Sequence, residues 1–194
     1  MSNSSQKTQN NLKKFLLNNF TSKKLIMRLI FTIIGAVIVI SYSTPLLFWA
    51  MHRDQPTSEH SFIYVNILIN TGISFGMNNS NTALVYFLQW TTSLIIIGIA
   101  LFSSKWYYSL FLALAFTGGL FNVIQRSCNV YVESCNGYAT NAVVDYFSFS
   151  FGKTSWNLPD VSIITGCVGS ILFYVINISV SYFKERKEKV NDAK

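Results

Sequence analysis

The sequence predicts an all-α polytopic membrane protein, with four transmembrane helices and a small extracytoplasmic β-sheet formed by loop insertions. Of its 194 residues, 51% are hydrophobic and only 12% are charged, about half of the roughly 25% charge expected of soluble domains. Charged side chains are absent from residues 29–51, 61–104, 106–125 and 161–183. A helix needs about 20 apolar residues to cross the bilayer core, so each tract holds one span, and the second, of 44 residues, also holds an additional segment.

We expect the four spans at residues 28–51, 83–103, 106–125 and 161–183. An even number of spans puts both termini on one side, and Lys and Arg favour cytoplasmic loops. Twelve of the 15 basic residues lie in the two terminal regions and at position 105, which gives net charges of +9 on that side and −2 on the other. The sequence therefore predicts cytoplasmic termini. The basic excess reflects topology, and no nucleic-acid partner is expected.

The remaining segments divide into tails and outer loops. We expect a disordered basic cytoplasmic tail over residues 1–24, a membrane domain over 25–183 and a charged cytoplasmic tail over 184–194. A cleaved signal peptide is a poor alternative for the first span, because its apolar run is too long and no small-x-small cleavage site follows.

The outer segments, residues 52–82 and 126–160, are longer than simple connectors require. Residues 62–70 are rich in β-branched and aromatic side chains, and their alternation puts Tyr64, Asn66 and Asn70 in one register, as in a half-buried strand. Residues 147–151 alternate Phe and Ser just as strictly. These patterns predict a small sheet lying on the outer leaflet.

Two acidic residues stand where a bilayer penalises charge. Asp145 lies inside an apolar run, and Asp160 begins the last span. Carboxylates at a membrane boundary are costly unless solvated or paired, so both are candidates for function. Asp160 also has a structural explanation of equal weight, since an acid in the first helical turn after an Asn157 N-cap complements the helix dipole.

If the two carboxyl groups meet, they form an acid–base pair of the aspartic protease kind. Two like charges a few Å apart share one proton. The ionised member could then take a proton from a water that attacks a peptide carbonyl, while the protonated member polarises that carbonyl. This chemistry requires no metal, cofactor or covalent nucleophile.

The third span carries a polar stripe. Gly118, Asn122 and Arg126 are four residues apart and so share one helical face. The glycine is partly explained by close helix packing. Asn122 and Arg126 are better explained as groups that orient a substrate backbone or hydrogen-bond a carboxylate.

Other chemistries find little support. Both histidines, His52 and His60, lie in the first outer segment, where they and two nearby acids, Asp54 and Glu59, would bind a metal only weakly. Cys128 and Cys135 could form a disulfide or remain free. Cys167 is most simply a small packing residue.

The motifs together resemble the bacterial lipoprotein signal peptidases (signal peptidase II). The similar segments, in family order, are N-T-G-I-S-F from Asn70, G-G-L-F-N-V-I-Q-R from Gly118, V-V-D-Y from Val143 and N-L-P-D from Asn157. The resemblance covers residues from about 65 to 170. The sequence departs from the family pattern at Gln125, where the family has Asp, and at Pro159, where it has a small residue. The first span also lacks the Asp and Lys often seen there in the family, since nothing from Leu29 to Met51 is charged.

The resemblance implies a site and an activity. It makes Asp145 and Asp160 the catalytic pair, and it gives a role in shaping or binding the substrate to five residues: Asn70, Gly72, Asn122, Arg126 and Asn157. The expected function is a membrane aspartic endopeptidase that cleaves bacterial prolipoproteins before a diacylglyceryl-modified cysteine near the outer leaflet of the cell membrane. We expect a monomer whose partners are these substrates and the lipid bilayer. The alternatives are an ion- or proton-coupled carrier using the same two acids, and a noncatalytic scaffold.

Overall fold

The protein is described by a computed structural model at residues 8–11, 13–14, 17, 21–53, 61–72, 81–103, 105–150 and 154–192. Asp54, Glu59, His60 and Phe151 lie outside these residues, as does much of the predicted N-terminal tail. Four helices in the described part are long and apolar enough to cross a membrane. They are α2 (Ser22–Met51), α3 (Thr82–Phe102), α4 (Trp106–Ser127) and α5 (Leu158–Asp192).

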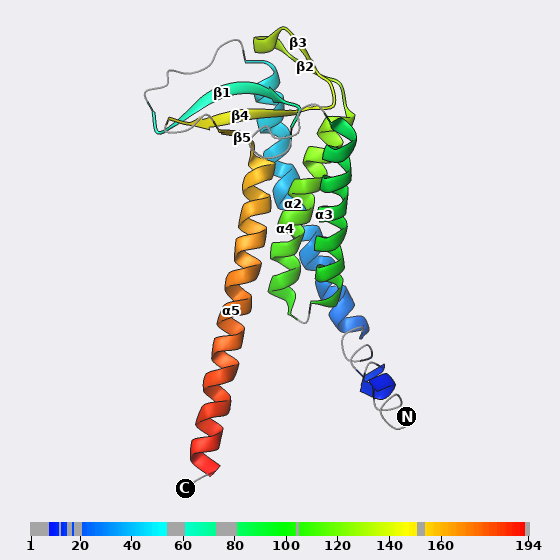
Figure 1. Ribbon diagram of the computed structural model, residues 1–194, viewed down its shortest axis with the longest axis vertical. Coiled ribbons are helices and arrows are strands. Elements are labelled where there is room, and N and C mark those ends of the chain that lie inside the picture. The colour runs from blue at the N-terminus through cyan, green and yellow to red at the C-terminus, as the bar shows by residue number, and fades with distance from the viewer. Residues whose placement is uncertain are drawn as a thin grey trace.

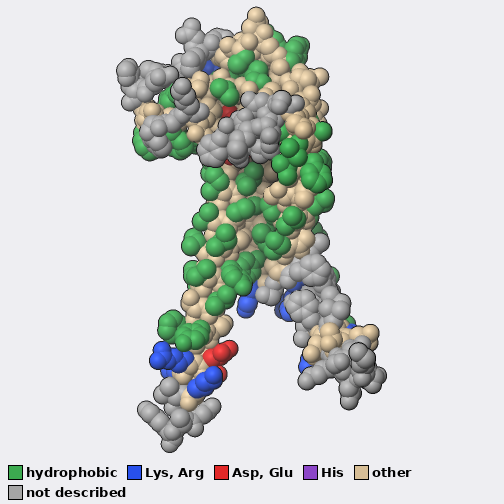
Figure 2. Space-filling view, viewed as in Figure 1, with side chains coloured by type: hydrophobic (Ala, Val, Ile, Leu, Met, Phe, Trp, Pro, Cys, Tyr) green, Lys and Arg blue, Asp and Glu red, His purple; other side chains and the backbone are tan. Residues whose placement is uncertain are grey.

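Helix α4 is the central element of the bundle and packs against α2, α3 and α5. Its buried side chains are mostly small or polar, including Ser109, Ala113 and Ala115, and small residues let membrane helices approach closely. Gly118 is the tightest point at the sheet end, because a Cβ there would lie 2.5 Å from the Pro159 carbonyl oxygen of α5. Hydrophobic side chains cover much of the bundle's visible face (Figure 2), as expected where hydrocarbon is the solvent.

Both sheets lie at one end of the bundle, and the C-terminal end of α5 lies at the other (Figure 1). The larger sheet is antiparallel, with strand order β1 (Ile63–Asn70), β4 (Val143–Phe149) and β5 (Ser155–Trp156). Strands β2 (Val130–Val132) and β3 (Gly137–Ala139) form a separate hairpin around the 3-10 turn η2 (Glu133–Cys135). The predicted fold class, four helices with a small sheet, is confirmed.

A bulge in β1 changes which side chains share a face. Tyr64 pairs with Ser148, but the register shifts between Val65 and Leu68, so that Leu68 pairs with Asp145 and Asn70 with Val143. Directly paired residues share a face, and an extra residue in one strand reverses the alternation beyond it. The predicted common register of Tyr64 and Asn70 is therefore wrong, since Asn70 lies on the face of Asp145.

The face of the sheet opposite Asp145 packs into the main hydrophobic core. Val144 and Tyr146 are buried with Ala50 at the end of α2 and with Val132 and Ala139 of the hairpin. This cluster fixes the sheet to the bundle and leaves the Asp145 face toward α4 and α5.

The ends of α5 differ from the predicted span. The helix begins at Leu158 and continues to Asp192, so most of the predicted charged tail is helical.

Cys128 and Cys135 are exposed free thiols rather than a disulfide. Cys167 is half-buried on α5.

Candidate functional site

A cavity of about 370 Å³ opens where the sheet meets the bundle. Its walls come from α3, α4, α5, β1, β4 and the segment at residues 154–157. It is lined by six of the seven predicted site residues, Asn70, Asn122, Arg126, Asp145, Asn157 and Asp160. Gly72, the seventh, is held beside them because its carbonyl oxygen accepts a hydrogen bond from Arg126.

Asp145 is 2% exposed in the middle of β4. Asn70 Nδ2 donates to its Oδ2 at 3.0 Å, and Asn157 Nδ2 donates to its Oδ1 at 3.0 Å. Burial, reinforced by the negative charge of Asp160, raises the pKa of Asp145 to about 7, although Asn70, Arg126 and Asn157 favour the ionised form. The group therefore exchanges its proton near neutral pH, as an acid–base residue should.

Asp160 lies in the first turn of α5 and is held by amides from two elements. Asn122 Nδ2 of α4 donates to its Oδ1 at 2.8 Å. The backbone N–H of Asn157 donates to its Oδ2 at 3.2 Å, and its own N–H donates to Asn157 Oδ1 at 3.0 Å. This reciprocal pair is a helix-capping arrangement. The structural explanation of Asp160 therefore holds, and it does not exclude a chemical role.

Asn157 joins the two acids. It is 1% exposed and lies between β5 and α5. Its side-chain amide donates to Asp145, while its backbone donates to Asp160. The same amide also donates to Asn122 Oδ1 at 3.3 Å. One residue thus fixes the position of both carboxyl groups.

Arg126 organises the turn after β1 instead of pairing with an acid. Its Nη1 donates to the carbonyl oxygens of Asn70 and Asn141, each at 3.1 Å, and its Nη2 donates to that of Gly72. The guanidinium therefore fixes the backbone that carries Asn70. The prediction that a polar residue of this stripe would bind a carboxylate is met by Asn122.

Two of the three departures from the family pattern, Pro159 and Gln125, lie beside the site and have different surroundings. Pro159 occupies the first turn of α5, where a missing N–H costs nothing, and the adjacent Leu158 N–H donates to the Tyr146 hydroxyl at 3.0 Å. Gln125 is 5% exposed, and its Nε2 has no hydrogen-bond partner in the described part of the chain. Nothing in the structure explains the latter substitution.

Among the cavity residues that were not predicted from the sequence, Gln89 of α3 and Trp156 of β5 carry buried polar atoms that lack a partner. Gln89 Oε1, Trp156 Nε1 and Arg126 Nε are buried without a hydrogen-bond partner among the described residues, and all three residues line the cavity. Buried polar atoms are nearly always paired, so these atoms are suited to a bound polar ligand. The sequence could have pointed to Gln89, because it is the only residue of α3 with an amide side chain.

Fold and site together define a four-helix membrane protein with two amide-bound carboxyl groups, one buried and one half-buried, in a cavity at one end of the bundle. The family model described as signal peptidase (SPase) II matches residues 33–177. The lipoprotein signal peptidase of Malacoplasma penetrans (strain HF-2) is 36% identical over 184 residues, which cover 91% of this chain and 75% of that protein.

A second relative agrees with this match, and a solved structure has a similar fold. The lipoprotein signal peptidase of Mycoplasmoides gallisepticum is 36% identical over 136 residues, covering 70% of this chain and 44% of that protein. A structure titled as a bacterial membrane enzyme, solved by the in meso method at 2.3 Å resolution, has a TM-score of 0.61 at 17% identity and covers 76% of this chain and 88% of that one.

The chain belongs to the signal peptidase II family. It is therefore a membrane peptidase, a hydrolase that cleaves signal peptides from prolipoproteins. The carrier and scaffold alternatives are not retained.

Proposed function

We propose that this peptidase cleaves bacterial prolipoproteins immediately before a diacylglyceryl-modified cysteine, with Asp145 and Asp160 as its catalytic pair. The observation that carries the proposal is the double contact of Asn157, which donates to both carboxyl groups within one cavity. Such a linked pair is suited to holding a single proton between two carboxylates.

The reaction follows from that shared proton. The ionised carboxylate takes a proton from a water whose oxygen attacks the carbonyl carbon of the scissile bond, and the protonated carboxyl donates its proton to the carbonyl oxygen. The tetrahedral intermediate then collapses as a carboxyl group returns a proton to the nitrogen of the cysteine. The C–N bond breaks, giving a free signal peptide carboxylate and a free cysteine amine. As the C–N bond breaks, one hydroxyl of the intermediate gives its proton back to the pair, and the proton of the other hydroxyl is released as the new carboxyl group ionises and the amine is protonated. The pair thus regains its shared proton, and no external reactant other than water is consumed.

The remaining residues of the cavity would position the substrate. Asn70, Gly72, Asn122, Arg126 and Asn157 shape the polar wall beside the acids. The buried Gln89 Oε1 can accept from a peptide N–H, and Trp156 Nε1 can donate to a peptide carbonyl. The apolar residues Leu88, Ile163 and Ile164 line the same cavity and suit the lipid-bearing side of the substrate.

The topology we propose has both termini in the cytoplasm and the cavity at the outer leaflet. The charge distribution of the sequence supports this orientation. We also propose the division into an N-terminal tail (1–24), a membrane domain (25–183) and a C-terminal tail (184–194), acting as a monomer. A lipid-anchored substrate could then reach the cavity from within the bilayer.

The test is cleavage of a purified diacylglyceryl prolipoprotein by the purified protein in detergent. Mass spectrometry of both products should locate cleavage directly before the lipid-modified cysteine, and the unlipidated precursor should be cleaved far more slowly. Cleavage at another bond, or equal cleavage of both precursors, would contradict the proposed specificity.

A further inference from the structure

Tyr146 follows Asp145 in β4 and lies on the opposite face of the sheet, because successive side chains of a strand alternate. Its side chain is 1% exposed and packs in the core between the sheet and α2, and it does not line the cavity that holds the two acids. The Tyr146 hydroxyl accepts a hydrogen bond from the Leu158 backbone N–H at 3.0 Å. Tyr146 therefore links the strand of Asp145 to the helix of Asp160 from behind the cavity.

This contact completes the hydrogen bonding of the first turn of α5. The first N–H groups of a helix have no partner within the helix. The Asp160 N–H donates to Asn157 Oδ1, and Pro159 has no N–H. The Leu158 N–H remains, and the Tyr146 hydroxyl accepts from it. An N–H without an acceptor or water is costly, so the contact holds the start of α5 against β4.

A second tyrosine, Tyr42 of α2, holds the same residue through its carbonyl group. The Leu158 carbonyl oxygen accepts from Ser162 Oγ at 2.9 Å, and Ser162 Oγ is also hydrogen-bonded to the Tyr42 hydroxyl. Ser162 is 2% exposed, so solvent does not compete for these contacts. The backbone of Leu158 is thus held at its N–H from β4 and at its C=O from α2.

We propose that the hydroxyls of Tyr146 and Tyr42, which we call the tyrosine brace, position Asp160 for catalysis. The inference rests on the proposed function and adds two positioning residues to the catalytic pair. Asp160 lies two residues beyond Leu158 in the same helix, so a displacement of Leu158 moves the Asp160 carboxyl group with it. A misplacement of about 1 Å at a reacting group can cost about 100-fold in rate.

The brace acts through geometry and not through charge. Neither brace hydroxyl makes a hydrogen bond to an acid among the residues that the structure describes. Burial raises the pKa of Tyr146 to about 12, so its hydroxyl stays neutral at pH values around 7. Replacing Tyr146 by Phe keeps the ring in the core and removes the link to α5.

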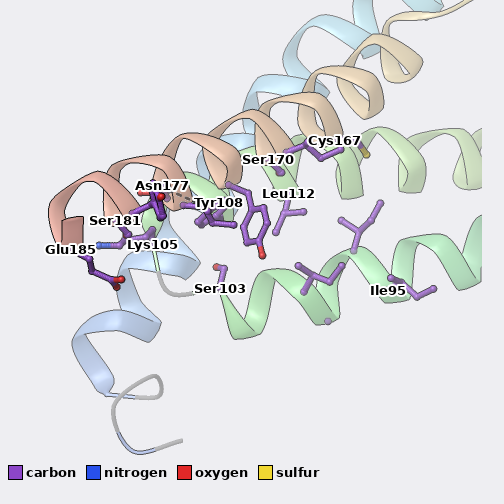
Figure 3. Close-up of a pocket in the computed structure, with 17 residues that line it drawn as sticks. Ile95, Ser103, Lys105, Tyr108, Leu112, Cys167, Ser170, Asn177, Ser181 and Glu185 are labelled. Carbon is purple, nitrogen blue, oxygen red and sulfur yellow. Dashed lines mark hydrogen bonds between the residues drawn. The ribbon is translucent and has the colours of Figure 1, made fainter. Parts of the chain in front are cut away.

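A tyrosine contact at the other end of the bundle supplies a matched control. There Asn177 of α5 accepts from the Tyr107 hydroxyl of α4 at 3.0 Å. Asn177 also donates to the Tyr108 hydroxyl at 3.1 Å, and these two residues line a second cavity (Figure 3). Tyr107 lines neither cavity. Asn177 lies 17 residues beyond Asp160 on α5, about 25 Å at 1.5 Å per residue, so Tyr107→Phe loosens α5 far from the acids.

The test compares Tyr146→Phe with Tyr107→Phe in the cleavage of lipidated prolipoprotein. Tyr146→Phe should lower kcat by about tenfold and leave KM within about twofold of wild type, because Tyr146 does not line the cavity. Tyr107→Phe should keep the wild-type kcat. Each variant loses one hydrogen bond of α5, so their melting temperatures in detergent should fall by similar amounts. A general loss of stability would therefore affect both variants.

The pH profile provides a readout that partial unfolding does not move. Burial and the charge of Asp160 raise the pKa of Asp145 to about 7, and both effects weaken if α5 moves away from β4. The other charged group that acts on Asp145 is Arg126, which belongs to α4 and keeps its place. The basic limb of kcat/KM should therefore move to lower pH by about half a unit in Tyr146→Phe and stay in place in Tyr107→Phe.

Tyr42→Phe tests the brace from α2 and decides the inference by itself if Tyr146→Phe does not fold. It should lower kcat by about threefold and move the basic limb in the same direction, a smaller effect because Ser162 still donates to the Leu158 carbonyl.

The outcomes separate this inference from the proposed function. If wild-type protein cleaves prolipoprotein and the folded brace variant keeps the wild-type kcat and basic limb, the brace is overturned while the proposed function stands. An equal loss of kcat in Tyr107→Phe would also overturn it, because the effect would then come from stability alone. Absence of cleavage by the wild-type protein would instead overturn the proposed function, and the brace with it.

Discussion

At the scale of single residues, Asn157 has two separable tasks. Its side-chain oxygen caps α5 by accepting from the Asp160 N–H, and its side-chain nitrogen donates to Asp145. The sequence identified Asn157 as a natural N-cap, because Asn favours that position. Its contact with Asp145 joins a strand to a helix and so depends on tertiary structure.

Substitution can separate these tasks. Asn157→Ser keeps a capping oxygen but loses the amide donor, so kcat should fall at least about 100-fold while the melting temperature changes little. Asn157→Ala loses both, and should in addition lose about 1 kcal/mol of stability. Assay of cleavage together with thermal unfolding in detergent checks both expectations. Wild-type kcat in Asn157→Ser would show that the amide contact has no part in catalysis.

The pH dependence reports on the shared proton. Because the pKa of Asp145 is raised to about 7, the pair should lose its proton as pH rises through about 7, and kcat/KM should fall on the basic side. Asn70 donates to the Asp145 carboxylate and so favours ionisation. Asn70→Leu removes that donor, which raises the pKa further and should move the basic limb to higher pH by about one unit.

A control for this shift lies in the same strand. Asn66 donates to Ser148 Oγ at 3.4 Å and makes no hydrogen bond to an acid among the residues that the structure describes, so Asn66→Leu should leave the pH profile in place. If the basic limb of the pH profile moved to lower pH in Asn70→Leu, Asn70 would not favour ionisation of Asp145, and its assigned role would be contradicted.

At the scale of elements, the sequence predicted the strand of residues 62–70 but not its bulge. Alternating hydrophobicity identifies a strand, whereas a bulge depends on the partner strand. Here the register shift between Val65 and Leu68 turns Asn70 toward Asp145. Gln89 and Trp156 were missed for a similar reason, since a buried polar atom without a partner is a property of the folded cavity.

The packing of α4 on α5 is a second property of elements and can be tested with two glycines. A Cβ at Gly118 would lie 2.5 Å from the Pro159 carbonyl oxygen, next to Asp160. Gly118→Ala should therefore push the helices apart, cost about 1–3 kcal/mol and lower kcat. Gly98→Ala adds the same methyl group to open space and should be neutral. Thermal unfolding and cleavage assays of both variants check these expectations. If Gly118→Ala changed neither the stability nor kcat, the close approach of α4 and α5 at Gly118 would be contradicted.

At the scale of the whole molecule, the sequence predicted the four helices and the sheet because charge and hydropathy are segregated along the chain. The two acids were found for the same reason, as carboxylates within or beside apolar runs. What the sequence left out is the cavity that holds the two acids, because it depends on how the sheet and the segment at residues 154–157 meet α3, α4 and α5. The molecule therefore holds a cavity with polar groups at one end of an apolar bundle.

The central claim is that Asp145 and Asp160 act together on the peptide bond. The most direct measurement is cleavage of lipidated prolipoprotein by Asp145→Asn and Asp160→Asn, with Glu133→Gln, an exposed acid outside the cavity, as control. Each Asp variant should bind substrate but lose at least about 100-fold in kcat, and the control should match the wild-type protein. Wild-type kcat in either Asp variant would contradict the account.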